Sequence, residues 1–306
     1  GQGHAIAAGA AVAEKFLEAR LGKTMMQHTI YCYISDGAVE EEISQGVGRI
    51  AGTLGLNNLI MFYDANEVQL STDTKEVMAE NTAMKYKAWN WNVIEINGND
   101  VDEIRGALRE AKMEQDRPTL IIGHTVMAKG ALKADGSSYE GSVKTHGAPL
   151  GDEAYRNTVV HLGGNPDDPF VIWDDVKQLY DRRREELRNI VRQRRTAEHQ
   201  WRESNPELAA QMDDWFSNKV PKVDFSNLVQ KRDVATRVAS SACLGELAKQ
   251  VSNMICASAD LSNSDKTDGF LKQTHDLIKG DFTGAFFQAG VAELTMADMC
   301  IGMALH

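Results

Sequence analysis

The chain has no hydrophobic run long enough to cross a membrane, and no stretch has the pattern of a secretory signal peptide. We therefore expect no membrane partner. Cysteine is scarce: 306 residues hold four, and no two of them form a Cys-x-x-Cys pair. This dispersed spacing is not that of a disulfide framework, so we expect buried free thiols in a reducing cytoplasm. The four are Cys32, Cys243, Cys256 and Cys300.

Positive charge is also in deficit, because 33 basic residues face 44 acidic ones and the formal net charge is −11. Nucleic-acid backbones need cationic surfaces, so this balance argues against a nucleic-acid partner. One predicted helix, from Trp173 to about Arg195, is rich in arginine. Glutamates interrupt its arginines, which is typical of an ordinary solvated face. Its apolar residues are expected to face inward, namely Val176, Leu179, Leu187 and Ile190.

The stretch from Ile30 to Val68 organises the chain. An apolar run, 30–34, breaks at Ser35-Asp36-Gly37, a helical pattern follows, and a second apolar run, 59–63, ends before Asn66. This order predicts a strand, a helix starting after Gly37 and a second strand, with the two strands parallel. Because ligands bind at the carboxyl edge of open α/β sheets, we expect Asp36 and Asn66 to meet there.

A carboxylate, an amide oxygen and a nearby backbone carbonyl are hard ligands, which suit Mg2+ or Ca2+. A helix start beside them favours a phosphate group. From the residues alone, a metal–diphosphate site competes with a simpler interpretation, in which acidic residues at strand ends cap the next helix.

Strand and helix patterns continue to alternate after this unit. Further strands are predicted at 92–96 and 119–123, and helices at 80–91 and 101–111. Alternation of this kind predicts an α/β fold with a doubly wound, mostly parallel sheet and helices on both faces. A linker near Pro221 divides the chain into residues 1–220 and a partial second α/β domain, 221–306.

Five short segments carry a family resemblance. They are Gly1-Gln2-Gly3 before an alanine-rich helix, Asp36-Gly37 with Asn66, 145–151 (Thr-His-Gly-Ala-Pro-Leu-Gly), 258–261 (Ser-Ala-Asp-Leu) and 290–293 (Gly-Val-Ala-Glu). Together, in this order, they resemble transketolase over almost the whole chain. Ser35 stands where the family's thiamine-diphosphate motif has its first glycine. A serine is costly there only if the position needs a positive φ or a close approach to phosphate.

The resemblance implies specific roles. Thiamine diphosphate, held with Mg2+ or Ca2+, is the expected cofactor. The metal ligands would be Asp36, Asn66 and Val68, and the catalytic residues Glu293 and His146. Glu293 would hold the aminopyrimidine ring in its active tautomer. Cofactor contacts are implied for Asp36, Gly37, Glu41, Asn66, Leu70, His146, Asp260 and Glu293, and sugar-phosphate contacts for Arg237 and Ser264.

In the resembled family the site lies at a homodimer interface, with Glu293 supplied by the partner chain. The expected reaction is transfer of a two-carbon ketol unit between ketose and aldose phosphates in the cytoplasm. Both ends of the chain look cut, so we expect an inactive internal piece of a larger enzyme. The alternatives are another thiamine-diphosphate enzyme, such as deoxyxylulose-phosphate synthase or a dehydrogenase E1 component, and a non-catalytic assembly subunit.

Overall fold

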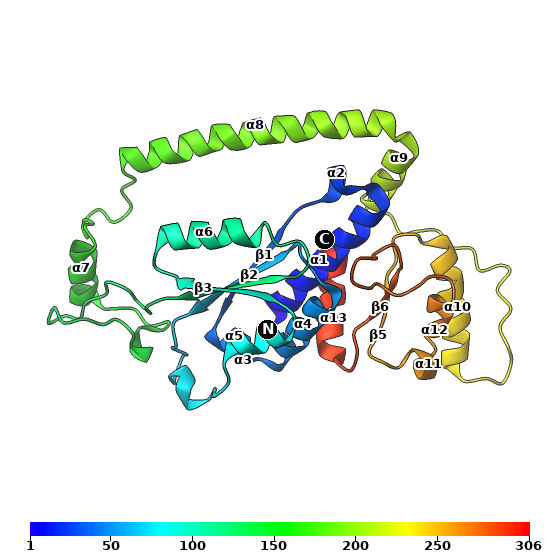
Figure 1. Ribbon diagram of the computed structural model, residues 1–306, viewed down its shortest axis with the longest axis horizontal. Coiled ribbons are helices and arrows are strands. Elements are labelled where there is room, and N and C mark those ends of the chain that lie inside the picture. Colours follow the sequence, from blue (N-terminus) through cyan, green and yellow to red (C-terminus); the bar gives the residue numbers. More distant parts are fainter.

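A four-stranded parallel sheet forms the centre of the larger part of the molecule (Figure 1). The computed structural model describes all residues from Gly1 to His306. The strand order is β1-β2-β4-β3, and every neighbouring pair is parallel. The strands are β1 (Ile30–Ser35), β2 (Leu59–Ala65), β3 (Asn92–Asn97) and β4 (Thr119–His124). The expected α/β fold with parallel strands is confirmed.

Helices cover both faces of this sheet. The main hydrophobic core lies on the face covered by α1 (Gln2–Leu21) and α4 (Glu42–Leu54), and it takes Leu59, Met61 and Tyr63 from β2. The intervening residue Ile60 points to the other face, where it packs against α6 (Val101–Ala111). This alternation follows from the two-residue period of a strand. Because both faces of the central strands β2 and β4 are covered, these two strands read as nearly continuous apolar runs.

The expected helix after Gly37 is divided into two. A short helix, α3 (Asp36–Glu40), ends at Glu41, whose backbone is extended, and α4 starts at the next residue. Side chains of α4 stabilise the break, because Ser44 Oγ donates to the Ala38 carbonyl (2.6 Å) and Gln45 Nε2 donates to the Val39 carbonyl (2.8 Å). These bonds satisfy carbonyls that a continuous helix would have bonded itself.

The remaining elements extend away from the sheet. Around and after it lie α2 (Lys23–Met26), α5 (Thr82–Ala88), α7 (Asp152–His161), α8 (Asp174–Ser204) and α9 (Pro206–Trp215). The C-terminal part has a two-stranded parallel sheet of β5 (Cys256–Ser258) and β6 (Phe286–Gln288). Its helices are α10 (Thr236–Gln250), α11 (Ser262–Asp265), α12 (Asp268–Leu271) and α13 (Glu293–Leu305). No helix has the length and apolar composition that a membrane span requires.

The prediction that the arginine-rich helix turns its apolar residues inward was wrong. Helix α8 runs along one side of the molecule and contacts only α2 and α9 closely (Figure 1). None of its residues is buried, and Leu179, Leu187 and Ile190 are exposed. The interleaving of charge was interpreted correctly, since Arg183, Arg184 and Arg188 each pair with an acidic residue three positions away.

Two smaller expectations also need correction. The helix expected over 80–91 is shorter, since α5 ends at Ala88; Trp91 then packs in the core at 1% exposure. All four cysteines are free as expected, but only Cys256 is buried. Strand β1 lies at the edge of the sheet, which leaves Cys32 partly accessible.

Helices α1 and α13 pack closely through glycine. A Cβ atom added at Gly9 would lie 2.0 Å from the Met299 carbonyl oxygen, and one at Gly302 would lie 2.1 Å from the Ile6 carbonyl oxygen. The small residues of α1 and α13 therefore let the two helix backbones approach each other closely.

Gly302→Ala is therefore expected to destabilise the protein by about 1–3 kcal/mol, because the added methyl group cannot fit without moving one helix backbone. The free energy of unfolding from urea titration measures this change. Gly106→Ala in α6 is the matched control, since open space surrounds that position. The control is expected to gain about 0.5–1 kcal/mol through helix propensity. Equal effects of the two substitutions would contradict the packing argument.

Candidate functional site

The parallel register of β1 and β2 brings Asp36 and Asn66 together. Ser35 at the end of β1 pairs with Asp64 in β2, so the two strands end at the same edge of the sheet. The Asn66 backbone N–H donates to Asp36 Oδ2 at 3.2 Å. The predicted convergence of these two residues at the carboxyl edge is thus confirmed as geometry, although they lie 30 positions apart.

The Asp36 carboxylate is buried, with only 2% of the residue exposed. Its second oxygen, Oδ1, accepts a hydrogen bond of 2.6 Å from the Tyr63 hydroxyl. Burial raises the pKa of Asp36 above its ordinary value, and the Tyr63 and Asn66 donors partly counter that rise. Burial and the adjacent Asp36 carboxylate also raise the pKa of Tyr63. A cation beside Asp36 would offset the cost of burying its charge.

Tyr63 is a residue of this site that the sequence did not reveal. Its apolar neighbours in β2 suggested only a core position, and indeed it is 4% exposed. The available signal was a tyrosine near the end of a strand, because the hydroxyl of a buried tyrosine usually needs a hydrogen-bond partner.

Asn66 and Val68 form a tight turn after β2. The Asn66 Oδ1 atom accepts from the Val68 backbone N–H at 3.1 Å, and Glu67 between them has a positive φ of 63°. The expected metal ligands Asp36, Asn66 and Val68 would supply one carboxylate and two neutral oxygens, a set of the kind that hard divalent cations take. No cluster of three or more His, Cys, Asp or Glu side chains able to hold a metal occurs in the chain.

The serine at the motif's first position is not strained. Ser35 has φ −122° and ψ 175°, an extended conformation that any residue adopts. Gly37 follows in the first turn of α3, and a Cβ atom added there would meet nothing within 4 Å. The backbone beside Asp36 thus remains open to a ligand.

Glu41 directly precedes α4, whereas Glu293 lies beside a cavity that residues of α4 line. Glu41 occupies the break before α4, and its carboxylate contacts the amino group of Gly1 at 2.9 Å. Glu293 is exposed at the start of α13 and lines a cavity of about 500 Å3 together with α4 residues. Asp36 and Asn66 do not line this cavity.

Arg49 and Ile43 of α4 contact the segment at the start of α13, and no sequence pattern predicted either contact. The Arg49 guanidinium donates to the Ala289 carbonyl at 2.8 Å, just before the Gly290–Glu293 segment. Thr295 in the first turn of α13 donates to the Ile43 carbonyl at 3.2 Å. Such contacts join positions more than 200 residues apart, which no local pattern encodes.

The other expected site residues are spread over several elements. Leu70 is 69% exposed in the loop after β2. His146 is half-buried, and its Nδ1 atom is buried without a hydrogen-bond partner. Asp260 follows β5 with a positive φ of 67°, and Ser264 lies in α11. Arg237 is exposed in the first turn of α10, which stands with α11 on the far side of the molecule from α3 (Figure 1).

Comparisons with known proteins agree with this geometry. The family model described as "Transketolase, thiamine diphosphate binding domain" matches residues 1–221, and "Transketolase, pyrimidine binding domain" matches residues 232–306. The chain is 35% identical to chloroplastic transketolase-1 of Arabidopsis thaliana and 31% identical to transketolase of Bacillus subtilis. Each alignment covers all of this chain but only 41% and 46% of the relative.

Solved structures give the same result. The transketolase from Leishmania mexicana superposes with a TM-score of 0.91 and 28% identity over 99% of this chain, which is 45% of that protein. A Pichia stipitis transketolase in complex with sedoheptulose 7-phosphate gives a TM-score of 0.89 and 27% identity, with similar coverage. The chain thus spans less than half the length of the relatives that it matches.

The buried position of Asp36 makes a prediction about pH. The folded state binds the Asp36 proton more tightly than the unfolded chain does, so this group stabilises the fold at low pH. That contribution is lost as pH rises through the raised pKa. Tyr63→Phe is expected to raise the pKa of Asp36 further, because the charged form loses a donor. Carboxyl-carbon NMR titration measures it, with the exposed Tyr180→Phe as control. A lower Asp36 pKa in Tyr63→Phe would contradict the assignment.

Proposed function

The chain belongs to the transketolase family, and we propose that it binds thiamine diphosphate with Mg2+ or Ca2+ as part of an enzyme that moves a two-carbon ketol unit. The donors and acceptors would be ketose and aldose phosphates. The observation that carries this proposal is the pairing of the buried Asp36 carboxylate with Asn66 at the carboxyl edge of the sheet. That edge is where open α/β sheets bind ligands.

Three residues would hold the metal. The Asp36 carboxylate supplies the charge, Asn66 its amide oxygen and Val68 its backbone carbonyl. Gly37 in the next position leaves its backbone uncrowded, since an added Cβ atom would meet nothing within 4 Å, and this would favour a phosphate group there. When bound, the cofactor supplies the carbanion chemistry of the reaction. The protein's part is to fix the diphosphate, to exclude water and to hold a proton at the far side of the ring.

The second half of the site would come from a partner chain in a homodimer. Glu293 is exposed and shares no cavity lining with Asp36 in its own chain, which suits a residue that serves another subunit. Its carboxyl group would hold the ring proton, with Glu41 beside it at the subunit interface. Asp260 and Leu70 would contact the ring system. Arg237 and Ser264 would bind the sugar phosphate, and His146 would contact both the diphosphate and the substrate.

Domain organisation and setting complete the proposal. We place the division between a diphosphate-binding domain and the start of a pyrimidine-binding domain at residue 220, and we propose a cytoplasmic enzyme. Sugar phosphates fit the exposed guanidinium of Arg237, because its planar fork binds phosphate in bidentate fashion.

Calorimetry with thiamine diphosphate and Mg2+ tests cofactor binding. Binding is expected to be saturable and metal-dependent. Asp36→Asn is expected to weaken it by at least about a hundredfold, or roughly 3 kcal/mol, because the only carboxylate of the metal set is lost. Asp102→Asn in the exposed first turn of α6 is the control, and it should bind like the parent chain. An absence of heat at high ligand concentration would favour a non-catalytic homologue instead.

The 306-residue chain alone is expected to show no ketol transfer, since it spans less than half of its catalytic relatives. A coupled assay with xylulose 5-phosphate and ribose 5-phosphate measures this directly. Robust turnover by the purified chain, confirmed by mass to have 306 residues, would refute the expectation.

A further inference from the structure

Each oxygen of the Asp36 carboxylate has a donor, and both donors come from β2 and the turn after it. The Tyr63 hydroxyl donates to Oδ1 at 2.6 Å, and the Asn66 backbone N–H donates to Oδ2 at 3.2 Å. The bond from Tyr63 has the length of a charge-assisted hydrogen bond, whereas the bond from Asn66 is at the long end of the normal range. Because Asp36 itself follows β1, the two bonds fasten the end of one strand to the next.

The Tyr63 ring is fixed by the main hydrophobic core. It is 4% exposed, and in the register of the sheet it pairs with Ile34 of β1. Its hydroxyl makes no hydrogen bond other than the one to Asp36. A closely packed ring with a single polar partner sets the position of that partner, because packing prevents the ring from moving with it.

The orientation of Asp36 depends on this hydroxyl. Without it, the carboxylate would keep only the longer bond to the Asn66 N–H and could turn about its side-chain torsions. The other expected side-chain ligand is held separately, since Asn66 Oδ1 accepts from the Val68 backbone N–H at 3.1 Å. Asp36 carries the only charge of the expected metal ligands, so cation binding depends on how its carboxylate is oriented.

We propose that Tyr63 is a positioning residue for the divalent cation, because its hydroxyl holds the Asp36 carboxylate in the orientation that binds the metal. This role rests on the proposed function and adds to it a residue that does not contact the cofactor. Partners that orient a metal ligand contribute about 10- to 100-fold to metal affinity. A purely structural hydroxyl would differ, since its removal from the core would change stability alone.

Calorimetric titration of the 306-residue chain with Mg2+, at saturating thiamine diphosphate, tests the role. In Tyr63→Phe the Kd for Mg2+ is expected to rise about tenfold or more, because the carboxylate loses its shorter hydrogen bond. Thiamine diphosphate titrated at saturating Mg2+ is expected to bind within about twofold of the parent chain, because Asp36 would contact the metal and not the diphosphate. A purely structural change would not produce this split.

Tyr86→Phe is the matched control. It removes the same hydroxyl from a second tyrosine of the main hydrophobic core, which is 1% exposed and is not a hydrogen-bond partner of Asp36. This variant should bind Mg2+ like the parent chain. Thermal unfolding verifies that both variants fold.

Amide hydrogen exchange supplies a measurement that needs no metal. Because the Asn66 N–H donates to Asp36, a loosened carboxylate is expected to speed its exchange at least about threefold in Tyr63→Phe, and not in Tyr86→Phe. If the parent chain shows no Mg2+-dependent heat, the proposed function and the role of Tyr63 both fall. If the parent binds and Tyr63→Phe binds Mg2+ equally well, or both tyrosine variants lose the same affinity, only the role of Tyr63 is overturned. Unchanged exchange at Asn66 would contradict it as well.

Discussion

The parallel pairing of β1 with β2 is the constraint on which the rest of the structure turns. It aligns Ser35 with Asp64, so Asp36 after β1 and Asn66 after β2 lie at the same edge of the sheet. A slip of one residue would exchange the two faces of β1 and move Ile34 out of the core. The hydrophobic pattern therefore fixes the register, and the register fixes the position of Asp36 against Asn66.

That register places a carboxylate where water cannot reach it well. The desolvation of Asp36 is only partly offset by Tyr63 and the Asn66 backbone, which is why burial still raises its pKa. A cation bound beside Asp36 would recover part of the free energy that its burial costs. The backbone of Ser35 is extended, a conformation that any residue adopts, so this position in the chain does not require a glycine.

The sequence predicted those parts of the structure that follow from the local spacing of apolar residues. The strands around Asp36 and Asn66 and helix α6 follow from apolar spacing, and the meeting of the two residues follows from parallel pairing. Prediction from the sequence failed where the outcome depends on a partner element. The apolar stripe of α8 is a correct helical period, yet burial needs something to pack against, and no such surface of this chain lies beside Leu179. The contacts of Arg49 and Tyr63 were equally hidden, since each is set by tertiary structure.

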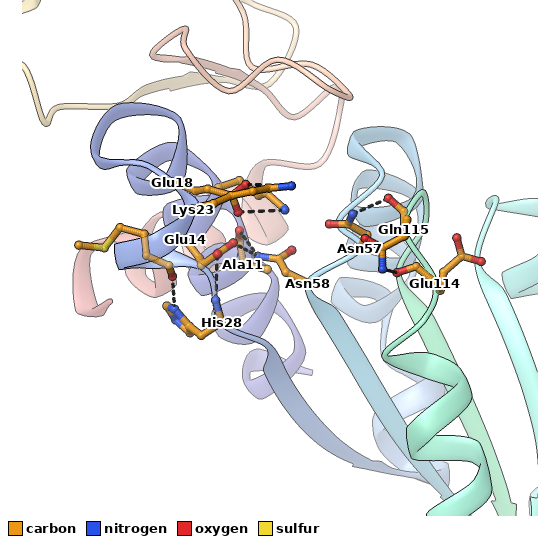
Figure 2. Close-up of polar contacts among 11 residues, drawn as sticks. Ala11, Glu14, Glu18, Lys23, His28, Asn57, Asn58, Glu114 and Gln115 are labelled. Carbon is orange, nitrogen blue, oxygen red and sulfur yellow. Dashed lines mark hydrogen bonds and ion pairs between the residues drawn. The ribbon is translucent and has the colours of Figure 1, made fainter. Parts of the chain in front are cut away.

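Helix α1 connects the two edges of the sheet. Its first residues lie against Glu41 and Ile43 near the carboxyl edge, whereas Glu14, three turns later, accepts a hydrogen bond from the Asn58 amide at the other edge (Figure 2). The same helix holds α13, and hence Glu293, through the close contacts at Gly9 and Gly302. A helix packed this tightly cannot shift at one end alone. The orientation of Asn58 and the position of Glu293 therefore share one rigid support, although one is buried at the amino edge and the other is exposed at the start of α13.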